Sequence, residues 1–247
     1  DGIITNPRGS IEKMENLPKL DYSFINLRDY YTKDRKIVHY ISSYGCPYAC
    51  TFCAEPEHSL RKWNGKTIEI MVDEFISIHE TTGCDRISFV DPNMSSNPWK
   101  VIALCKLLID VRNPVLFNCN MRAKDIVFMM KKVDVSLLYK AGFRRIFVGV
   151  ESGSDSQLKV LKKSSNSNDH FNAIMALDKA GIEVQASFIH DLPNESFEQA
   201  METLELSKKL INLNTQVRIN PTTFICHFQE QNCLTISQKA VKINLTM

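Results

Sequence analysis

Short apolar runs and helix-like stretches alternate along most of the 247-residue chain. The apolar runs are rich in β-branched and aromatic residues, and they predict strands at residues 37–41, 86–90, 115–118, 145–150, 182–189 and 216–219. Between them, apolar residues recur every three or four positions, which predicts helices at residues 67–82, 98–111, 124–141, 154–161, 169–180 and 196–210. Strands that alternate with helices at this spacing predict an α/β fold with parallel strands, as a barrel or an open barrel.

The two ends of the chain lack this pattern. Residues 1–36 are polar and interrupted by proline and glycine, which predicts a lead-in segment before a core over residues 37–226. Residues 227–247 show no clear amphipathicity, and we expect a truncation or an altered reading frame in this tail. The chain begins with Asp1 instead of methionine, so we also expect it to be a piece of a longer product.

The net charge of the chain says little about its partners. The chain carries 30 basic and 28 acidic side chains, a formal net charge of +2. This balance indicates neither a nucleic-acid footprint nor attraction to an anionic membrane, and no apolar run is long enough to span a bilayer. Eight cysteines without a signal peptide indicate a reducing compartment, so we expect a cytoplasmic protein.

Three of the cysteines are grouped in one loop. Cys46, Cys50 and Cys53 follow the first predicted strand and are separated by three and then two residues. Thiolates grouped in this way hold iron–sulfur clusters, and three ligands leave one coordination position open for a substrate or cofactor. The alternative is three buried cysteines or a redox pair, but buried cysteines are normally scattered along strands and helices. The other five are expected to be small apolar fillers: Cys84, Cys105, Cys119, Cys226 and Cys233.

The cysteine spacing, with the aromatic Phe52 before the third cysteine, resembles the signature of the radical S-adenosylmethionine (SAM) enzymes. The resemblance implies a partial parallel (β/α)6 barrel of the radical SAM type. It also implies that Cys46, Cys50 and Cys53 hold a 4Fe-4S cluster whose open iron binds the amino and carboxylate groups of SAM. The reduced cluster would cleave SAM to a 5′-deoxyadenosyl radical, with an electron donor such as flavodoxin or ferredoxin.

Chemically distinctive residues gather where the predicted strands end. Besides the cysteine loop, they are Asp91, Asn120, Arg122, Glu151, His190 and Asp191. Parallel α/β barrels carry their active sites at the carboxyl ends of their strands. We therefore expect these side chains to converge on one mouth of the barrel.

The resemblance implies cofactor-binding roles for four residues. Asp91 would accept a hydrogen bond from the SAM amino group, although an Asx turn before Pro92 explains it equally well. Glu151 would bind the ribose hydroxyls or the amine of SAM, and the alternative is a glutamate at a helix N-terminus. Arg122 lies in a stretch similar to the cobalamin-dependent branch, and Phe52 would place its backbone near the adenine while supporting the cysteine loop.

The cobalamin-dependent branch is the part of the family that the chain resembles most. Its members transfer methyl groups, or rearrange and close rings. The chain lacks the Asp-x-His-x-x-Gly motif that ligates cobalamin, so an upstream part would have to supply that cofactor. His190 stands where relatives carry a small residue, and it is either a substrate-facing acid/base or a local change. Two alternatives stay open: a cobalamin-free radical SAM enzyme such as a methylthiotransferase, and a non-catalytic iron–sulfur module. The sequence does not indicate which small molecule is the substrate.

Overall fold

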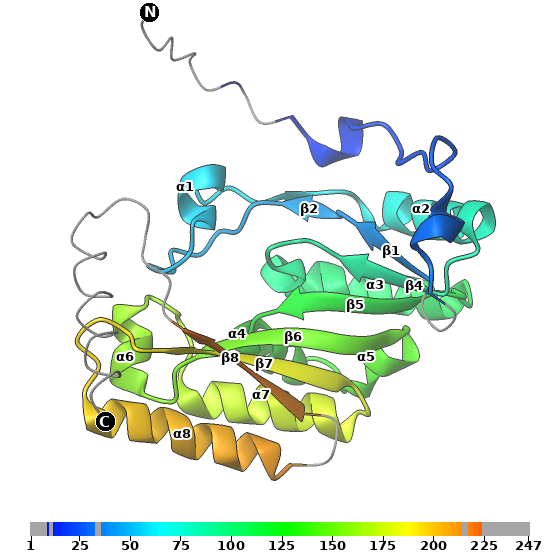
Figure 1. Cartoon of the computed structure of the whole chain (residues 1–247). Helices are drawn as coiled ribbons and strands as arrows, with labels where there is room; N and C mark the ends of the chain where they lie inside the picture. Colours follow the sequence, from blue (N-terminus) through cyan, green and yellow to red (C-terminus); the bar gives the residue numbers. More distant parts are fainter. Residues whose placement is uncertain (1–8, 10–11, 33–35, 214–216, 224–247) are drawn as a thin grey trace, which may run out of the picture.

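A six-stranded parallel sheet forms the centre of the molecule, in a computed structural model that describes residues 9, 12–32, 36–213 and 217–223 (Figure 1). Its strands lie in chain order: β1 (Ile37–Tyr40), β4 (Arg86–Phe89), β5 (Leu116–Met121), β6 (Phe143–Glu151), β7 (Glu183–His190) and β8 (Val217–Thr223). Every neighbouring pair is parallel. The predicted α/β fold is therefore confirmed, and β1 and β8 are the two edges of a partial barrel.

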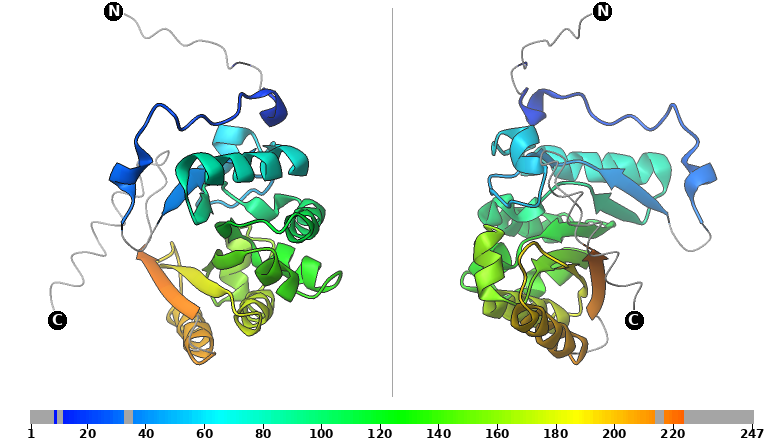
Figure 2. Two further views of the ribbon diagram at one scale, coloured as in Figure 1. Left: turned by 90° about the vertical axis from the view of Figure 1, so that its right-hand side faces the viewer. Right: turned by 60° about the vertical axis from the view of Figure 1, so that its left-hand side comes forward.

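Helices cover one side of this curved sheet (Figure 2). They are α2 (Ile68–Thr82), α3 (Pro98–Asp110), α4 (Ala123–Met130), α5 (Ser136–Lys140), α7 (Ser167–Lys179) and α8 (Phe197–Ile211). The short helix α6 (Asp155–Val160) lies instead at the carboxyl ends of the strands (Figure 1). Side chains fix several of their starts: Thr67 accepts from the Ile70 amide, and Asn166 and Ser196 each form a capping box. Among the described residues, no helix has both the length and the apolar character needed to cross a membrane.

The single helix predicted over residues 124–141 is wrong, because the chain forms α4 and α5 with a break between them. At the break, Asp134 Oδ1 accepts a hydrogen bond from the Ser136 amide at 2.8 Å. An aspartate that binds the backbone two residues ahead offers the chain an alternative to the helical ladder. The apolar periodicity continues through the break because both helices bury one face.

A small hairpin frames the cysteine loop and was not predicted. Strands β2 (Ser43–Tyr44) and β3 (Asn64–Gly65) pair antiparallel, and the residues between them carry the three cysteines and the short helix α1 (Glu55–Ser59). Two-residue strands are too short to show an alternating pattern in sequence. The hairpin closes the base of the loop, so both ends of the cysteine segment are held by backbone pairing.

Aromatic rings and small thiols fill the core behind the sheet. Phe75 and Phe89 contact each other and both Tyr40 and Phe117, with ring centroids 5.1–5.7 Å apart. Three cysteines predicted as apolar fillers are buried, with exposed fractions of 0–4%: Cys84, Cys105 and Cys119. Cys226, Cys233 and the tail at residues 227–247 lie outside the described residues.

The lead-in segment lies along the β1 edge of the sheet. Its described part contains two short 3₁₀ turns, Met14–Asn16 and Leu27–Tyr30. Tyr22 donates a hydrogen bond from its hydroxyl to the His39 carbonyl at 2.7 Å, and its ring packs against the core. The division into residues 1–36, 37–226 and 227–247 stays a prediction.

Candidate active site

The cysteine loop is held in place by backbone contacts with residues more than a hundred positions away. The Thr51 amide donates to the Leu161 carbonyl at 3.1 Å, just beyond the end of α6. Within the loop, the Cys53 amide donates to the Cys50 carbonyl at 3.2 Å. The sulfur of Cys53 accepts from the Glu55 amide at 3.4 Å. These bonds order the loop around the three thiols, none of which forms a disulfide.

Gly45, directly before the first cysteine, has no room for a side chain. Its φ is +85°, and an added β-carbon would overlap the Lys62 carbonyl oxygen. We expect Gly45→Ala to lower the unfolding free energy by about 1 kcal/mol for the backbone strain, plus about 1–3 kcal/mol for the overlap. Gly83→Ala is the control, because Gly83 has a φ of +65° with open space around it. Urea unfolding of both variants checks this, and equal losses would contradict the role of the overlap.

The three cysteines line one cavity of about 270 Å³ at the carboxyl ends of the strands. Residues from three further strand ends and from the loop after α6 complete its wall, among them Asn93, Asn120, Arg122, Glu151 and Lys163. Phe52 also lines the cavity. The structure therefore brings together Cys46, Cys50, Cys53, Phe52, Arg122 and Glu151 of the predicted site residues.

Arg122 follows β5 and is buried against the cysteine loop. Its Nη1 donates to Cys50 Sγ at 3.2 Å, and its Nη2 donates to the Lys163 carbonyl. The guanidinium carbon lies 3.6 Å from the centre of the Tyr48 ring, a cation–π contact. Arg122 thus places a positive charge beside the thiol of Cys50 and links the cysteine loop to β5.

Glu151 ends β6 in the left-handed region, with φ +68°, at a shift in the register between β6 and β7. Its Oε1 accepts from Lys163 Nζ at 2.6 Å, and both side chains are more than nine-tenths buried. Lys163 also lies over the Phe52 ring at 5.6 Å. Glu151 therefore points into the cavity, and the alternative of an outward glutamate at a helix start does not fit its burial.

Lys163 is a cavity residue that sequence reasoning missed. It lies in the polar connection between α6 and α7, where the sequence shows two adjacent lysines, Lys162 and Lys163, with nothing to distinguish them. Lys162 is exposed whereas Lys163 is buried. Only the path of the chain after α6 decides which ammonium reaches Glu151.

The structure does not bring Asp91 to the cavity wall. Its carboxylate is buried and accepts from the Ser42 amide at 2.8 Å, and from the hydroxyls of Ser42 and Ser43. Burial raises the pKa of Asp91, against the lowering effect of these hydrogen bonds. From the same turn, Pro92 and Asn93 line the cavity. Contact between Asp91 and SAM stays a prediction, and the visible role of the carboxylate is to tie the end of β4 to the chain after β1.

A second buried network, also missed in the sequence, centres on Asp125 at the start of α4. Tyr48 donates to Asp125 Oδ1 at 2.5 Å, while Asn93 and Ser95 donate to Oδ2 at 3.1 and 2.9 Å. Burial and the hydrogen bond to Asp125 raise the pKa of Tyr48. The network joins the cysteine loop, the β4 turn and α4, so it fixes three of the segments that surround the cavity.

His190 and Asp191 are not among the residues that line the cavity. His190 is exposed at the end of β7, and Asp191 follows with a φ of +60°. A buried histidine lies closer to the site: His170 on α7 accepts or donates a hydrogen bond with Ser165 at 2.7 Å. Burial, with the nearby charges of Lys163 and Arg122, lowers the pKa of His170 to about 3. His170 is therefore neutral at physiological pH.

The chemistry of the donor set fits an iron–sulfur cluster. Three thiols that line one cavity suit a group with several metal atoms. Burial raises the pKa values of Cys46 and Cys53, whereas Arg122 and Lys163 act to lower them respectively.

Two buried polar atoms of residues that line the cavity form no hydrogen bond within the described structure. Arg122 Nε and Glu55 Oε1 are buried, and neither has a hydrogen-bond partner within the described structure. Buried polar atoms are normally hydrogen-bonded, so such exceptions need an explanation. A polar ligand in the cavity would provide one.

A family model described as the radical SAM superfamily matches residues 40–207. The chain belongs to the radical SAM superfamily. The predicted family is thereby confirmed, and the matched residues include the cysteine loop and all the predicted site residues of the radical SAM chain.

Similar proteins include methyltransferases and cyclases. The radical SAM chain is 22% identical over 204 residues to an uncharacterised methyltransferase of Pyrococcus horikoshii, covering 83% of this chain and 44% of the relative. It is 25% identical over 207 residues to the anaerobic magnesium-protoporphyrin IX monomethyl ester cyclase of a Synechocystis species, covering 82% and 40%. These relatives, which are named as enzymes, support the prediction that this chain belongs to an enzyme. The chain spans less than half of their length.

A solved structure supports the fold. The cobalamin-dependent S-adenosylmethionine radical enzyme OxsB, with aqua-cobalamin bound, superposes with a TM-score of 0.64 at 21% identity. The match covers 83% of the radical SAM chain and 36% of OxsB. At this identity the comparison shows the fold alone, which agrees with the predicted partial barrel.

Proposed function

We propose that the chain is the catalytic core of a radical SAM enzyme that cleaves SAM reductively to a 5′-deoxyadenosyl radical. One observation carries the proposal: three free thiols line a cavity at the carboxyl ends of parallel strands, together with two buried cations, Arg122 and Lys163. A 4Fe-4S cluster held by three thiolates is anionic, and buried cations nearby offset that charge. When bound, the cluster would supply one electron to the sulfonium of SAM.

Cys46, Cys50 and Cys53 would hold the cluster, and other residues of the wall would receive SAM. Glu151 offers a carboxylate for an ammonium or for ribose hydroxyls, and it is already positioned by Lys163. Arg122 has an unpaired Nε–H that can donate to the carboxylate of SAM. Phe52 forms part of the wall. Asp91 would also bind the cofactor. In the same turn, the amide side chain of Asn93 belongs to a residue that lines the cavity.

The reaction that follows is proposed as methyl transfer or radical rearrangement or cyclisation. Relatives named as methyltransferases and cyclases support this class. Cobalamin would be bound by parts of the whole protein outside this chain. The structural match to the cobalamin-dependent enzyme OxsB covers only 36% of that protein. The substrate stays open, because the relatives are named for different reactions.

Anaerobic reconstitution tests the proposal. The protein is loaded with iron and sulfide and reduced with dithionite, and electron paramagnetic resonance is recorded before and after addition of SAM. Release of 5′-deoxyadenosine with dithionite as reductant is then measured. We expect a 4Fe-4S signal that changes with SAM, together with 5′-deoxyadenosine. A cluster that forms without cleaving SAM would favour a non-catalytic iron–sulfur module instead.

A further inference from the structure

Tyr48 lies in the cysteine loop, between the first two cysteines, and connects an aspartate to an arginine. Its hydroxyl donates to Asp125 Oδ1 at 2.5 Å, and the guanidinium carbon of Arg122 lies over its ring, 3.6 Å from the centre. The guanidinium donates in turn from Nη1 to Cys50 Sγ at 3.2 Å. A chain of contacts therefore runs from Asp125 through Tyr48 and Arg122 to a cysteine sulfur.

Asp125 fixes both the ring of Tyr48 and the backbone of Arg122. Its side chain is buried in the first turn of α4, where it accepts hydrogen bonds from Tyr48, Asn93 and Ser95. The Ser95 hydroxyl oxygen also accepts from the Arg122 amide at 3.1 Å. A buried polar network whose members are all hydrogen-bonded is rigid, so Asp125 holds Arg122 at two points.

The Tyr48 ring provides one of three contacts that hold the Arg122 guanidinium. An arginine side chain loses much rotamer freedom when it is fixed, so several contacts are needed to keep it in one position. Two are hydrogen bonds, to Cys50 Sγ and to the Lys163 carbonyl. The third is the cation–π contact with the ring, which is stronger where water is excluded. Loss of the hydrogen bond that holds the ring would therefore loosen the guanidinium beside Cys50.

The guanidinium of Arg122 is placed where it would act on the charge of a bound cluster. Hydrogen bonds to the sulfurs are among the factors that set the reduction potential of iron–sulfur clusters. Reduction adds one negative charge, so a cation within hydrogen-bond distance of a ligand sulfur stabilises the reduced state over the oxidised one. Cys50 is buried, so solvent screens little of this effect. The position of Arg122 thus bears directly on how easily the cluster is reduced.

We propose that Tyr48 and Asp125 are positioning residues that hold Arg122 against Cys50 and thereby raise the reduction potential of the cluster. The proposal rests on the proposed function, because Cys50 would be a ligand of that cluster. Neither Tyr48 nor Asp125 is among the residues that line the cavity, so both act through Arg122. In the reduction itself no bond forms or breaks: the cluster gains one electron and the reductant, dithionite in the experiment below, loses it.

A redox titration followed by electron paramagnetic resonance, on the reconstituted protein without SAM, tests the proposal. Arg122→Met removes the cation, and we expect the ratio of reduced to oxidised cluster at a fixed potential to fall about tenfold. For a one-electron couple this is a shift of about 59 mV to more negative potential. Tyr48→Phe keeps the ring but loses the bond to Asp125, and we expect a fall of about threefold. Adding Tyr48→Phe to Arg122→Met is expected to lower the ratio no further, because the tyrosine acts through the arginine.

Tyr40→Phe is the matched control for Tyr48→Phe. Tyr40 also donates from its hydroxyl to a buried carboxylate, that of Glu74. Neither Tyr40 nor Glu74 is among the residues that line the cavity. We expect the control to lose stability but to keep the wild-type potential, which separates the loss of a buried hydrogen bond from the loss of positioning.

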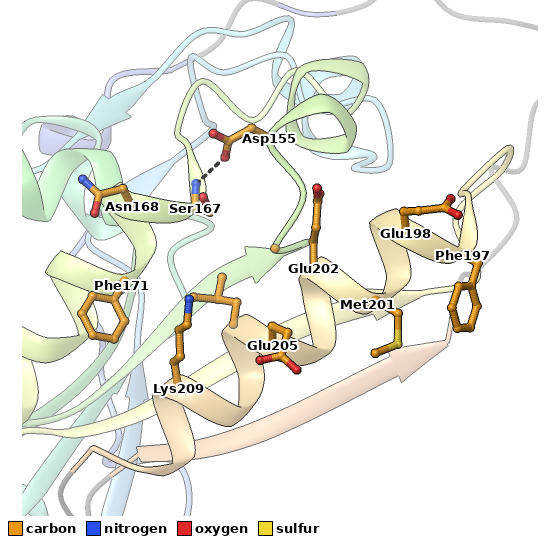
Figure 3. Close-up of a pocket in the computed structure, with 12 residues that line it drawn as sticks. Asp155, Ser167, Asn168, Phe171, Phe197, Glu198, Met201, Glu202, Glu205 and Lys209 are labelled. Carbon is orange, nitrogen blue, oxygen red and sulfur yellow. Dashed lines mark hydrogen bonds between the residues drawn. The ribbon is translucent and has the colours of Figure 1, made fainter.

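Asp125→Asn tests the other positioning residue. An amide nitrogen cannot accept a hydrogen bond, so one side of the network loses its acceptor, and we expect the ratio to fall as it does in Tyr48→Phe. Asp155→Asn is its control. Asp155 also lies in the first turn of a helix, α6, but it is exposed, accepts from the Ser167 amide at 2.7 Å and lines a groove between α7 and α8 (Figure 3). We expect this control to keep the wild-type potential.

Iron content and urea unfolding first establish that each variant is loaded and folded. A wild-type potential in Tyr48→Phe, or an equal shift in Tyr40→Phe, would overturn the positioning role. So would a further fall when Tyr48→Phe is added to Arg122→Met, because the tyrosine would then act without the arginine. A folded Tyr48→Phe protein without a cluster would overturn it in favour of a role in holding the loop. Failure of the wild type to form a cluster or to cleave SAM would instead overturn the proposed function.

Discussion

Replacing Cys46, Cys50 and Cys53 together with alanine is expected to abolish both the iron–sulfur cluster and SAM cleavage. The three thiols line one cavity, and none of them forms a disulfide. Removing all of them leaves iron with no thiolate ligand there, while the fold loses only small side chains in a loop. Iron and sulfide content after reconstitution, the visible absorbance and 5′-deoxyadenosine release measure the effect.

Cys105→Ala provides the control for the triple variant. Cys105 is a fully buried thiol on α3, so the same substitution is made in the core instead of the loop. We expect this variant to bind iron and to release 5′-deoxyadenosine like the wild type. A triple variant that keeps its cluster, or a control that loses it, would show that the loop thiols are not the ligands.

Lys163→Met is expected to destabilise the protein by about 3–5 kcal/mol, the usual cost of removing one partner of a buried ion pair. The ammonium contacts Glu151 at 2.6 Å with both side chains buried, so the glutamate charge would be left without compensation. Adding Glu151→Gln to the same protein removes that charge, and we expect part of the lost stability to return. Urea unfolding of the single and double variants measures both effects.

The neighbouring Lys162→Met is the control for Lys163→Met. Lys162 has the same charge and lies in the same connection, but it is exposed. A surface substitution of this kind is expected to change the unfolding free energy by less than about 0.5 kcal/mol. Equal losses at the two lysines would mean that the connection, and not the Glu151–Lys163 pair, carries the stability.

Sequence patterns predicted the main elements because these are decided locally. The strand at residues 86–90 and the helix at residues 67–82 are found almost as predicted. The spacing of their apolar residues, and the capping residues of the helix, lie within or next to each segment. The helix at residues 124–141 failed because one Asp134 hydrogen bond competes with the helical ladder. The hairpin β2–β3 was missed because its pairing joins residues about twenty positions apart, with no pattern inside either strand.

In the candidate site, too, some positions could be predicted from the sequence and others could not. The cysteine spacing, and the arrival of Arg122 and Glu151 at strand ends, could be predicted because parallel strands bring their carboxyl ends together. The position of Asp91 could not, since a carboxylate at a strand end can turn either to the cavity or to the chain beside it. The hydroxyls of Ser42 and Ser43 decide this in favour of the chain.

By itself, the sequence determined the parallel α/β architecture, the family and the three thiols, because each of these depends on residues close together along the chain. Tertiary structure alone decided which distant groups surround those thiols. Arg122 reaches Cys50 across 72 residues, and Lys163 instead of Lys162 reaches Glu151. Such contacts depend on strand register and on the path of a connecting loop, and neither leaves a periodic trace in the sequence.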